Sequence, residues 1–347
     1  MVMASRTSPS TKRGGENDWW LALAAIGVAL FGVVMIYTAT RSGLVVQGLP
    51  GTYFLKRQGV FVLISIVVMG LLWRGDYRRI EQIATAAYVG LLILLLAVVL
   101  AVSTYCNRRP EGLTLRDVSR LLLMAGIPIA LILVQPDLGT AIILSVVLMV
   151  MLAVAGVPGR ILLLLLGAGV LVVIVAVAGG FLSSYQIHRL TSFLNQNSTN
   201  PSLQTAIYNV KQAKIAIGSG GLWGSGIGHG VQTNLGYVPE QQTDFIFTAV
   251  GEQLGFLGTT LVLSALGFVG YRILRAAIQA KDILGQLLCA GIFAFYTFSV
   301  FQNAGMTMGI MPVTGIPLPF LSYGGSAALV FFIATGIVLS VEARRGG

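Results

Sequence analysis

Apolar runs of about 20 residues recur along this chain and alternate with shorter polar segments. They predict helices near residues 19–40, 58–74, 82–102, 120–136, 138–157, 161–181, 245–270, 283–310 and 326–342. A helix of this length crosses the roughly 30 Å hydrocarbon core of a bilayer, and it satisfies its own backbone hydrogen bonds there. The pattern therefore predicts an all-α, polytopic membrane protein with nine readable spans.

Two long segments interrupt the apolar pattern. Within the polar connection 182–244, residues 206–216 space apolar side chains at helical intervals, as in a helix lying on a membrane surface. Residues 218–230 follow, with seven glycines in thirteen positions. Either a backbone surface that receives a ligand or a tight re-entrant turn explains this composition. The segment 311–326 carries three prolines and three glycines, and such irregular backbone must be buried in protein or line a cavity.

Composition supports the membrane assignment. Hydrophobic residues make up 56% and charged residues 10%, against about 25% charged in soluble domains. The net charge of +10 indicates membrane orientation and contact with anionic lipid, not nucleic acid. Cys106 and Cys289 form neither a disulfide framework nor metal-ligand spacing. His188 and His229 are too few to indicate a zinc site.

Basic clusters set the predicted orientation. They are Arg6, Lys12 and Arg13; Arg74, Arg78 and Arg79; and Arg108, Arg109, Arg116 and Arg120. The positive-inside bias makes residues 1–17 a cytoplasmic tail and 182–244 a large extracytoplasmic loop. However, only the span 82–102 separates the second cluster from the third, and one crossing cannot have both ends in the cytoplasm. Either one cluster is extracellular or, as we favour, a segment is missing near residues 102–106.

Four of the twelve carboxylates lie at or near the predicted outer side: Asp137, Glu240, Asp244 and Glu252. Asp137, between Pro and Leu-Gly, fits turn chemistry, and Glu240 fits a solvated loop. Glu252 lies inside an apolar span, where a charge is costly, so we expect it to pair with a cation or line a cavity. Asp244 lies where the polar loop meets a span, where it can cap that helix or serve a functional site, and the two roles do not exclude each other.

Several ordered segments resemble the signatures of the SEDS family (shape, elongation, division and sporulation). They are Asp18-Trp-Trp through Met35-Ile-Tyr37, Gln135-Pro-Asp-Leu-Gly-Thr140, Lys214-Ile-Ala-Ile-Gly-Ser-Gly-Gly221, Pro239-Glu-Gln-Gln-Thr-Asp-Phe-Ile-Phe247 and Pro312-Val-Thr-Gly-Ile-Pro-Leu-Pro-Phe-Leu-Ser-Tyr-Gly-Gly-Ser326. The last favours the RodA type over the division homologue. The resemblance covers nearly all of 1–347 as a single membrane domain. It implies about ten transmembrane helices with both termini in the cytoplasm.

The resemblance also implies an activity. It is that of a peptidoglycan glycosyltransferase of the bacterial inner membrane, which polymerises lipid II on the extracytoplasmic side. Its implied partners are a class B penicillin-binding protein and other elongation-complex proteins. Asp244 matches the family's essential Asp. The chain departs from the family where an Asn-Gly-x-x-Arg-Trp stretch and a helix opening Gln-Pro-x-Glu-x-x-Lys are absent, at the point where the charge pattern fails. Gln253 also replaces a frequent Glu.

The chemistry indicates roles for individual residues. An α-linked diphosphate donor and a β-1,4 product imply inversion, and the acceptor 4-hydroxyl must lose a proton, so Asp244 is the candidate general base. Cations, or a divalent Mg²⁺ or Mn²⁺, would balance the leaving diphosphate, although no ligand spacing marks a metal site. The candidate substrate-binding residues are Arg189, Lys211, Lys214, Gly218, Gly220, Gly221, Glu240, Ser322, Tyr323 and Gly324. Binding of anionic lipid headgroups explains the three cations equally well.

Three other functions compete with polymerisation. A lipid II flippase would need charged groups along a path across the whole bilayer, whereas the candidate residues gather on one side. A non-catalytic scaffold for a penicillin-binding protein would need only interaction surfaces, and Asp244→Ala would leave product formation intact. A small-molecule transporter would show inverted repeats and helices broken at the midplane, and the chain shows no clear repeat.

Overall fold

The computed structural model describes residues 19–74, 91–108, 115–134, 137–179 and 204–344, with residues 187, 193 and 196. Within these ranges the structure is helical and contains no strand. Six helices are long and apolar enough to cross a membrane: α1 (Trp19–Val46), α2 (Tyr53–Arg74), α7 (Gly159–Ala178), α11 (Ile246–Gln279), α12 (Ile283–Thr307) and α13 (Gly325–Ala343). The others are α4 (Leu91–Asn107), α5 (Leu115–Val134), α6 (Leu138–Val154), α9 (Gln204–Ser219) and α10 (Val231–Leu235). The predicted all-α, multi-pass membrane fold is confirmed.

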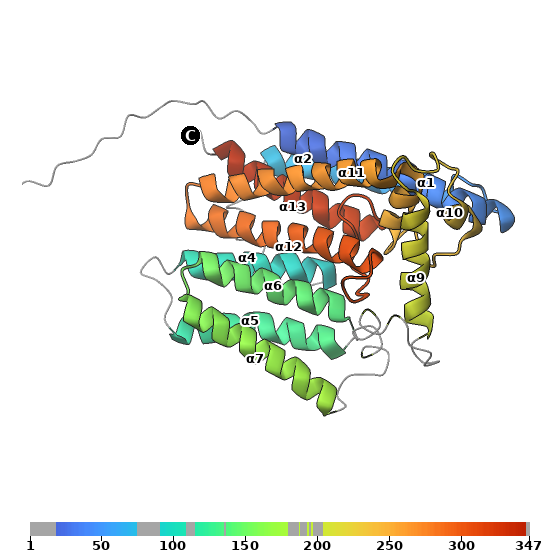
Figure 1. The fold of residues 1–347 in the computed structure, drawn as a ribbon. Coiled ribbons are helices and arrows are strands. Elements are labelled where there is room, and N and C mark those ends of the chain that lie inside the picture. The colour runs from blue at the N-terminus through green and yellow to red at the C-terminus, as the bar shows by residue number, and fades with distance from the viewer. Residues whose placement is uncertain are drawn as a thin grey trace, which may run out of the picture.

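The membrane helices lie side by side with roughly aligned axes (Figure 1), and α12 packs against α11, α6, α4 and α13. Helices α2 and α13 run in the same direction, as their contacts show: Gly325 packs against Phe61, and the later Gly336 packs against the later residues Met69 and Leu72. Small residues permit such close approach between membrane helices. Helix α9 runs crosswise at one end of this bundle. The helix predicted at 206–216 is therefore present, while the side of the membrane it faces stays a prediction.

Two groups mark the ends of the bundle. Arg272 of α11 and Glu342 of α13 approach to 3.8 Å at one end, which we call the Arg272 end. Asp244 precedes α11 at the other end, which we call the Asp244 end. Helix α2 ends at Arg74 on the Arg272 side, since it runs parallel to α13. These two ends serve as the reference for all positions below.

The junction of α4 with α5 bears on the predicted missing segment. Tyr105 Oη donates a 2.8 Å hydrogen bond to Asp117 Oδ1, which joins the end of α4 to the start of α5. This junction lies at the Arg272 end, because α5 leads from it toward Asp137 at the Asp244 end. Helix α4 is continuous through 102–106. Residues 75–90 lie outside the described residues, so the missing segment stays a prediction.

Candidate active site

Asp244 lies in a tight turn built on the carbonyl group of Glu240. The backbone N–H groups of Thr243, Asp244 and Phe245 donate to Glu240 O over 3.2, 3.1 and 3.4 Å. Glu240 adopts a φ of 49° and its side chain is exposed. The N-cap of α11 is Phe245, so Asp244 precedes the cap position and the capping interpretation is wrong. The half-buried Asp244 side chain is thus placed by the turn.

Two side-chain amides of α12 hold this turn and the proline-rich segment together. Asn303 Nδ2 donates to the carbonyl oxygens of Asp244 and Ile316, each over 2.8 Å. Gln302 Nε2 donates to Pro312 O over 2.8 Å. Both amides are buried, where an unpaired carbonyl would be costly. The backbone of Asp244 is therefore fixed to α12.

The predicted residues Ser322, Tyr323 and Gly324 meet the same turn from the other side. The Tyr323 N–H donates to Gln242 O over 2.8 Å. The amide of Gln58 on α2 brackets the segment, since Nε2 donates to Ser322 O and Oε1 accepts from the Gly324 N–H. Ser322 is buried and its hydroxyl accepts from Leu318 N–H. Ser322 therefore acts on this segment's backbone, while Tyr323 adjoins the Asp244 turn.

Helix α9 packs beside the turn and carries two of the predicted cations. Its buried face packs against Phe245, with Met306 and Val313 in the same cluster. Lys211 and Lys214 are exposed on α9, and Lys214 Nζ donates to Gln196 Oε1 over 2.8 Å. Gly218, near the end of α9, faces open space. Arg189 lies outside the described residues.

The glycine-rich loop repairs a break in α11. Gly255 has φ 66° and ψ −163° inside that helix, so backbone groups around it lose their helical partners. The loop replaces them: Ser225 and Gly226 N–H donate to Glu252 and Gln253 O, and Phe256 and Leu257 N–H donate to Gly221 and Leu222 O, over 2.8–3.2 Å.

Glycine is required for this close contact between loop and helix. A Cβ on Gly220 would lie 2.0 Å from Gly251 O, and one on Gly224 would lie 2.2 Å from Gln253 O. Gly221 adopts a φ of 54°. The glycines thus allow the backbone of this loop to approach the backbone of α11 closely. The sequence did not predict the break, because glycine is common in unbroken membrane helices.

Glu252 accepts hydrogen bonds from α10 and not from a cation among the described residues. Its Oε1 accepts from Gln232 N–H over 2.7 Å, and Oε2 accepts from the N–H and hydroxyl of Thr233 over 2.8 and 2.6 Å. Gly230 fits directly against this carboxylate. The expected cation pairing is therefore not what stabilises Glu252; three hydrogen bonds stabilise the buried charge.

A buried chain of hydrogen bonds continues from Glu252 to the Asp244 turn. Gln241 Nε2 donates to the hydroxyls of Thr233 and Thr248 over 3.1 and 3.0 Å. Thr248 in turn donates to Phe245 O over 2.7 Å. Each threonine hydroxyl accepts from Gln241 and donates onward, Thr233 to Glu252 and Thr248 to Phe245 O. Glu252 thereby helps fix the residue that follows Asp244.

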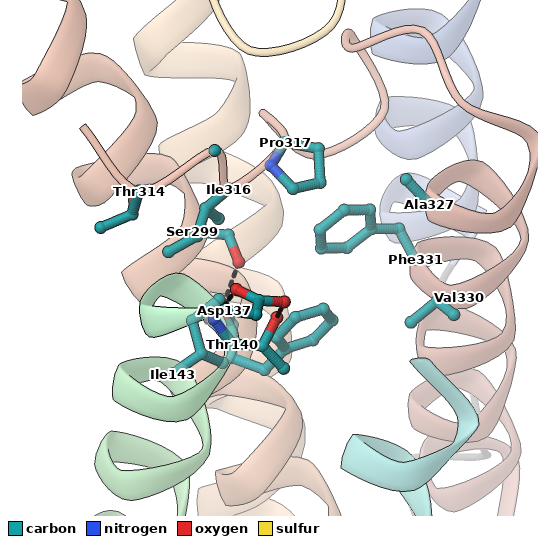
Figure 2. A pocket seen from close by; sticks show the side chains of 12 residues that line it. Asp137, Thr140, Ile143, Ser299, Thr314, Ile316, Pro317, Ala327, Val330 and Phe331 are labelled. Carbon is teal, nitrogen blue, oxygen red and sulfur yellow. Dashed lines mark hydrogen bonds between the residues drawn. The ribbon is translucent and has the colours of Figure 1, made fainter. Parts of the chain in front are cut away.

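Asp137 has the structural role expected of it, and the structure specifies that role as the N-cap of α6. Oδ1 accepts from Thr140 N–H over 3.0 Å and Oδ2 from the Thr140 hydroxyl over 2.6 Å. Figure 2 shows Asp137 at the edge of a cavity of about 70 Å³, which Ser299, Pro317 and Phe331 also line. Asn303 links the roof of this cavity, at Ile316, to Asp244.

Sequence reasoning missed the amides that assemble the site. Gln58, Asn303 and Gln302 lie within apolar helices and are buried. A polar amide in a membrane span is itself a signal, because it usually bonds across to a neighbouring element. The sequence could not show which backbone group each of these amides would bind.

Fold and site together define a class: a multi-pass helical membrane protein that holds a carboxylate-bearing turn at one end of its bundle. The family model of cell cycle proteins, FtsW/RodA/SpoVE, matches residues 18–109 and 96–346. The chain belongs to this family. Residues 96–109 match the model twice, and this range includes the predicted position of the missing segment.

Named relatives and solved structures agree with the family. The chain is 31% identical to a probable peptidoglycan glycosyltransferase FtsW of Trichlorobacter lovleyi, over 95% of the chain and 94% of that protein. It is 33% identical to the peptidoglycan glycosyltransferase MrdB of Escherichia coli K12, over 92% and 84%. A chain of a solved peptidoglycan synthase complex superposes with a TM-score of 0.77 at 25% identity, over 95% and 98%. Thermus thermophilus RodA, at 24% identity and a TM-score of 0.66 over 95% and 98%, shares the fold.

Proposed function

We propose that this chain is a peptidoglycan glycosyltransferase that polymerises lipid II at the bacterial inner membrane, with its Asp244 end extracytoplasmic. The names of its relatives support the activity. One structural observation carries the assignment of the site: α12, the 311–326 segment and the Glu252 chain all converge on the Asp244 turn. Fixed placement of a reacting group is what a catalytic carboxylate needs.

Asp244 acts as general base in this mechanism. It accepts the proton of the acceptor 4-hydroxyl while that oxygen attacks the anomeric carbon of the donor. The bond from this carbon to the diphosphate oxygen breaks, and undecaprenyl diphosphate leaves. One displacement inverts the α-linked donor into a β-1,4 glycan. The hydroxyl must lie within hydrogen-bond reach of Asp244 for the transfer.

Lys211 and Lys214 are the described cations that we propose to balance the leaving diphosphate. Both are on α9, which packs beside Phe245. Fixed positive charge near a leaving group stabilises the transition state. Mg²⁺ or Mn²⁺ would supply the same charge, held by the diphosphate itself together with a carboxylate. We propose the lysines for this role, with or without such an ion.

The partner in this proposal is a class B penicillin-binding protein, with other elongation-complex proteins. The superposition on a chain of a peptidoglycan synthase complex supports it, since that complex couples polymerisation to crosslinking. Such a partner would crosslink the strands that this chain makes.

We also propose that the chain lacks a family segment near residues 102–106. The alignment with the Trichlorobacter protein spans 366 positions, more than the 347 residues of this chain. That relative therefore carries residues without counterparts here. Inserting its corresponding segment between α2 and α5 tests the idea: higher activity supports a deletion, and unchanged activity contradicts it.

The deciding experiment is lipid II polymerisation by the purified chain, alone and with its penicillin-binding partner. We expect glycan strands from the wild type and none from Asp244→Asn, an isosteric change. Asp282→Asn removes a carboxylate at the N-cap of α12, at the Arg272 end, and keeps an acceptor for Gly285 N–H; it is the matched control and should remain active. Polymer from Asp244→Asn at the wild-type rate favours the scaffold. Absence of polymer from the wild type, together with lipid II transfer across vesicles, favours the flippase.

A further inference from the structure

The tip of the glycine-rich loop presents an exposed apolar pair. Leu222 is 64% exposed and Trp223 is 80% exposed. Leu222 O accepts from Leu257 N–H over 3.2 Å, and Gly221 O accepts from Phe256 N–H over 2.8 Å. Phe256 and Leu257 are themselves exposed on α11. The loop tip thus extends the apolar outer stripe of a membrane-spanning helix.

The depth of this tip follows from the length of α11. Gly255 lies 17 residues from Arg272, which corresponds to about 26 Å of helix. Arg272 pairs with Glu342 at the far end of the bundle. Trp19 and Trp73 also pack together there, with ring centroids 4.5 Å apart, as interfacial aromatic residues do. With a core of about 30 Å, the break at Gly255 lies near the boundary of the hydrocarbon on the Asp244 side.

The loop backbone is suited to that depth. Irregular backbone entering the membrane must have its polar groups paired within the protein. Four hydrogen bonds to α11 pair Gly221, Leu222, Ser225 and Gly226. Gly224 N–H donates to Gly220 O, and Gly228 N–H donates to Gln253 Oε1. Such pairing is unnecessary for a loop that stands in water.

We propose that this loop is a membrane-interface anchor, with Leu222 and Trp223 inserted among the lipids of the leaflet on the Asp244 side. The exposed side chains of Leu222 and Trp223 therefore contact the lipid bilayer and not a protein partner. Tryptophan suits the position because its ring is apolar and its indole N–H can bond to lipid carbonyl and phosphate groups. The inference is independent of the reaction proposed above.

The anchor sets the height of the Asp244 turn over the lipid. Ser225 binds Glu252 O through both its N–H and its hydroxyl, and the carboxylate of Glu252 begins the chain that ends at Phe245 O. The inserted tip and the turn therefore move together. An enzyme with a lipid-linked substrate would thereby keep its reacting group at a fixed distance from the membrane.

A spin label at Leu222→Cys tests the insertion in vesicles. Cys106 and Cys289 are both buried and are the only two cysteines in the sequence, so labelling is selective. We expect strong collision with oxygen and weak collision with a water-soluble nickel complex. Val46→Cys is the control, since Val46 ends α1 about 40 Å of helix from Trp19 and should collide with nickel. Equal nickel collision at both positions overturns the anchor.

A second measurement covers the case in which the cysteine variant misfolds. Trp19, Trp20 and Trp73 are replaced by Phe, so that Trp223 is the sole fluorophore. Lipids brominated near the headgroup should quench its emission strongly, and aqueous iodide weakly. The reverse order overturns the anchor. Protection from iodide that appears only after a penicillin-binding protein is added would instead identify a protein-docking surface, and this too overturns it.

Discussion

Asn303 holds Asp244 through the backbone: its Nδ2 donates to the Asp244 carbonyl over 2.8 Å from 59 positions further along the chain. The same nitrogen donates to Ile316 O. One buried amide therefore joins the candidate base to the proline-rich segment. The contact from Asn303 therefore fixes the main chain of the candidate base.

Replacing Asn303 by Leu should impair polymerisation more than stability alone explains. Two buried carbonyls lose their donor, at about 1–3 kcal/mol each, and misplacing a reacting group by about 1 Å can cost about 100-fold in rate. The measurements are thermal unfolding and turnover of lipid II. Gln302→Leu is the control, since it frees only Pro312 O. Similar losses of rate in both variants would contradict a special role for Asn303.

Thr233→Val should break the hydrogen-bond chain between Glu252 and the Asp244 turn. The change is nearly isosteric, removes one of the three donors to Glu252 and removes one of the two acceptors of Gln241 Nε2, which retains Thr248. We expect a loss of stability of about 1–3 kcal/mol and a fall in kcat with KM little changed. Thr233→Ser retains the hydroxyl and should restore the wild-type values. If the Ser variant is as impaired as the Val variant, the methyl packing and not the hydrogen bond matters.

Gly220→Ala should displace the glycine-rich loop from α11. The added Cβ would approach Gly251 O to 2.0 Å, and overpacking of this kind costs about 1–3 kcal/mol or more. Gly218→Ala, two residues earlier, meets open space near the end of α9 and should be neutral or stabilise by up to about 1 kcal/mol. Unfolding temperatures in detergent distinguish the two, and equal effects would show that this contact is not essential.

Lys214→Gln should raise KM for lipid II if Lys214 binds the diphosphate. A tenfold rise corresponds to about 1.4 kcal/mol. Lys214→Arg keeps the charge and should recover most of the affinity, while added salt should weaken wild-type binding. Lys211→Gln, one turn earlier on α9, is measured in parallel. An unchanged KM with weaker binding to anionic vesicles would assign these lysines to lipid headgroups.

The spans could be predicted from the sequence because a run of about 20 apolar residues is by itself enough to indicate a membrane helix. Each of the nine predicted spans overlaps a helix, although α11 extends to Gln279 and α1 to Val46. The predicted turn role of Asp137 is also confirmed. The cytoplasmic tail 1–17 lies outside the described residues, and the sidedness of 182–244 stays a prediction.

The contacts within the site could not be predicted, because they depend on which distant elements meet. Gln58 of α2 meets residues 322–324, and Asn303 of α12 meets the turn before α11. No period or spacing encodes such pairings. The break at Gly255 was hidden for a different reason: its four backbone partners come from a loop some 30 residues earlier, and local sequence reports only local propensity.

The loop bonds also couple the two parts of α11 on either side of Gly255. Bilayers differ in thickness, and a membrane helix adjusts to a mismatch by tilting. The loop accepts from Phe256 and Leu257 N–H on one side of the break and donates to Glu252 and Gln253 O on the other. A tilt of α11 is therefore passed to the loop and, through the hydrogen-bond chain that begins at Glu252, to the Asp244 turn. The thickness of the membrane thus becomes an input to the position of Asp244.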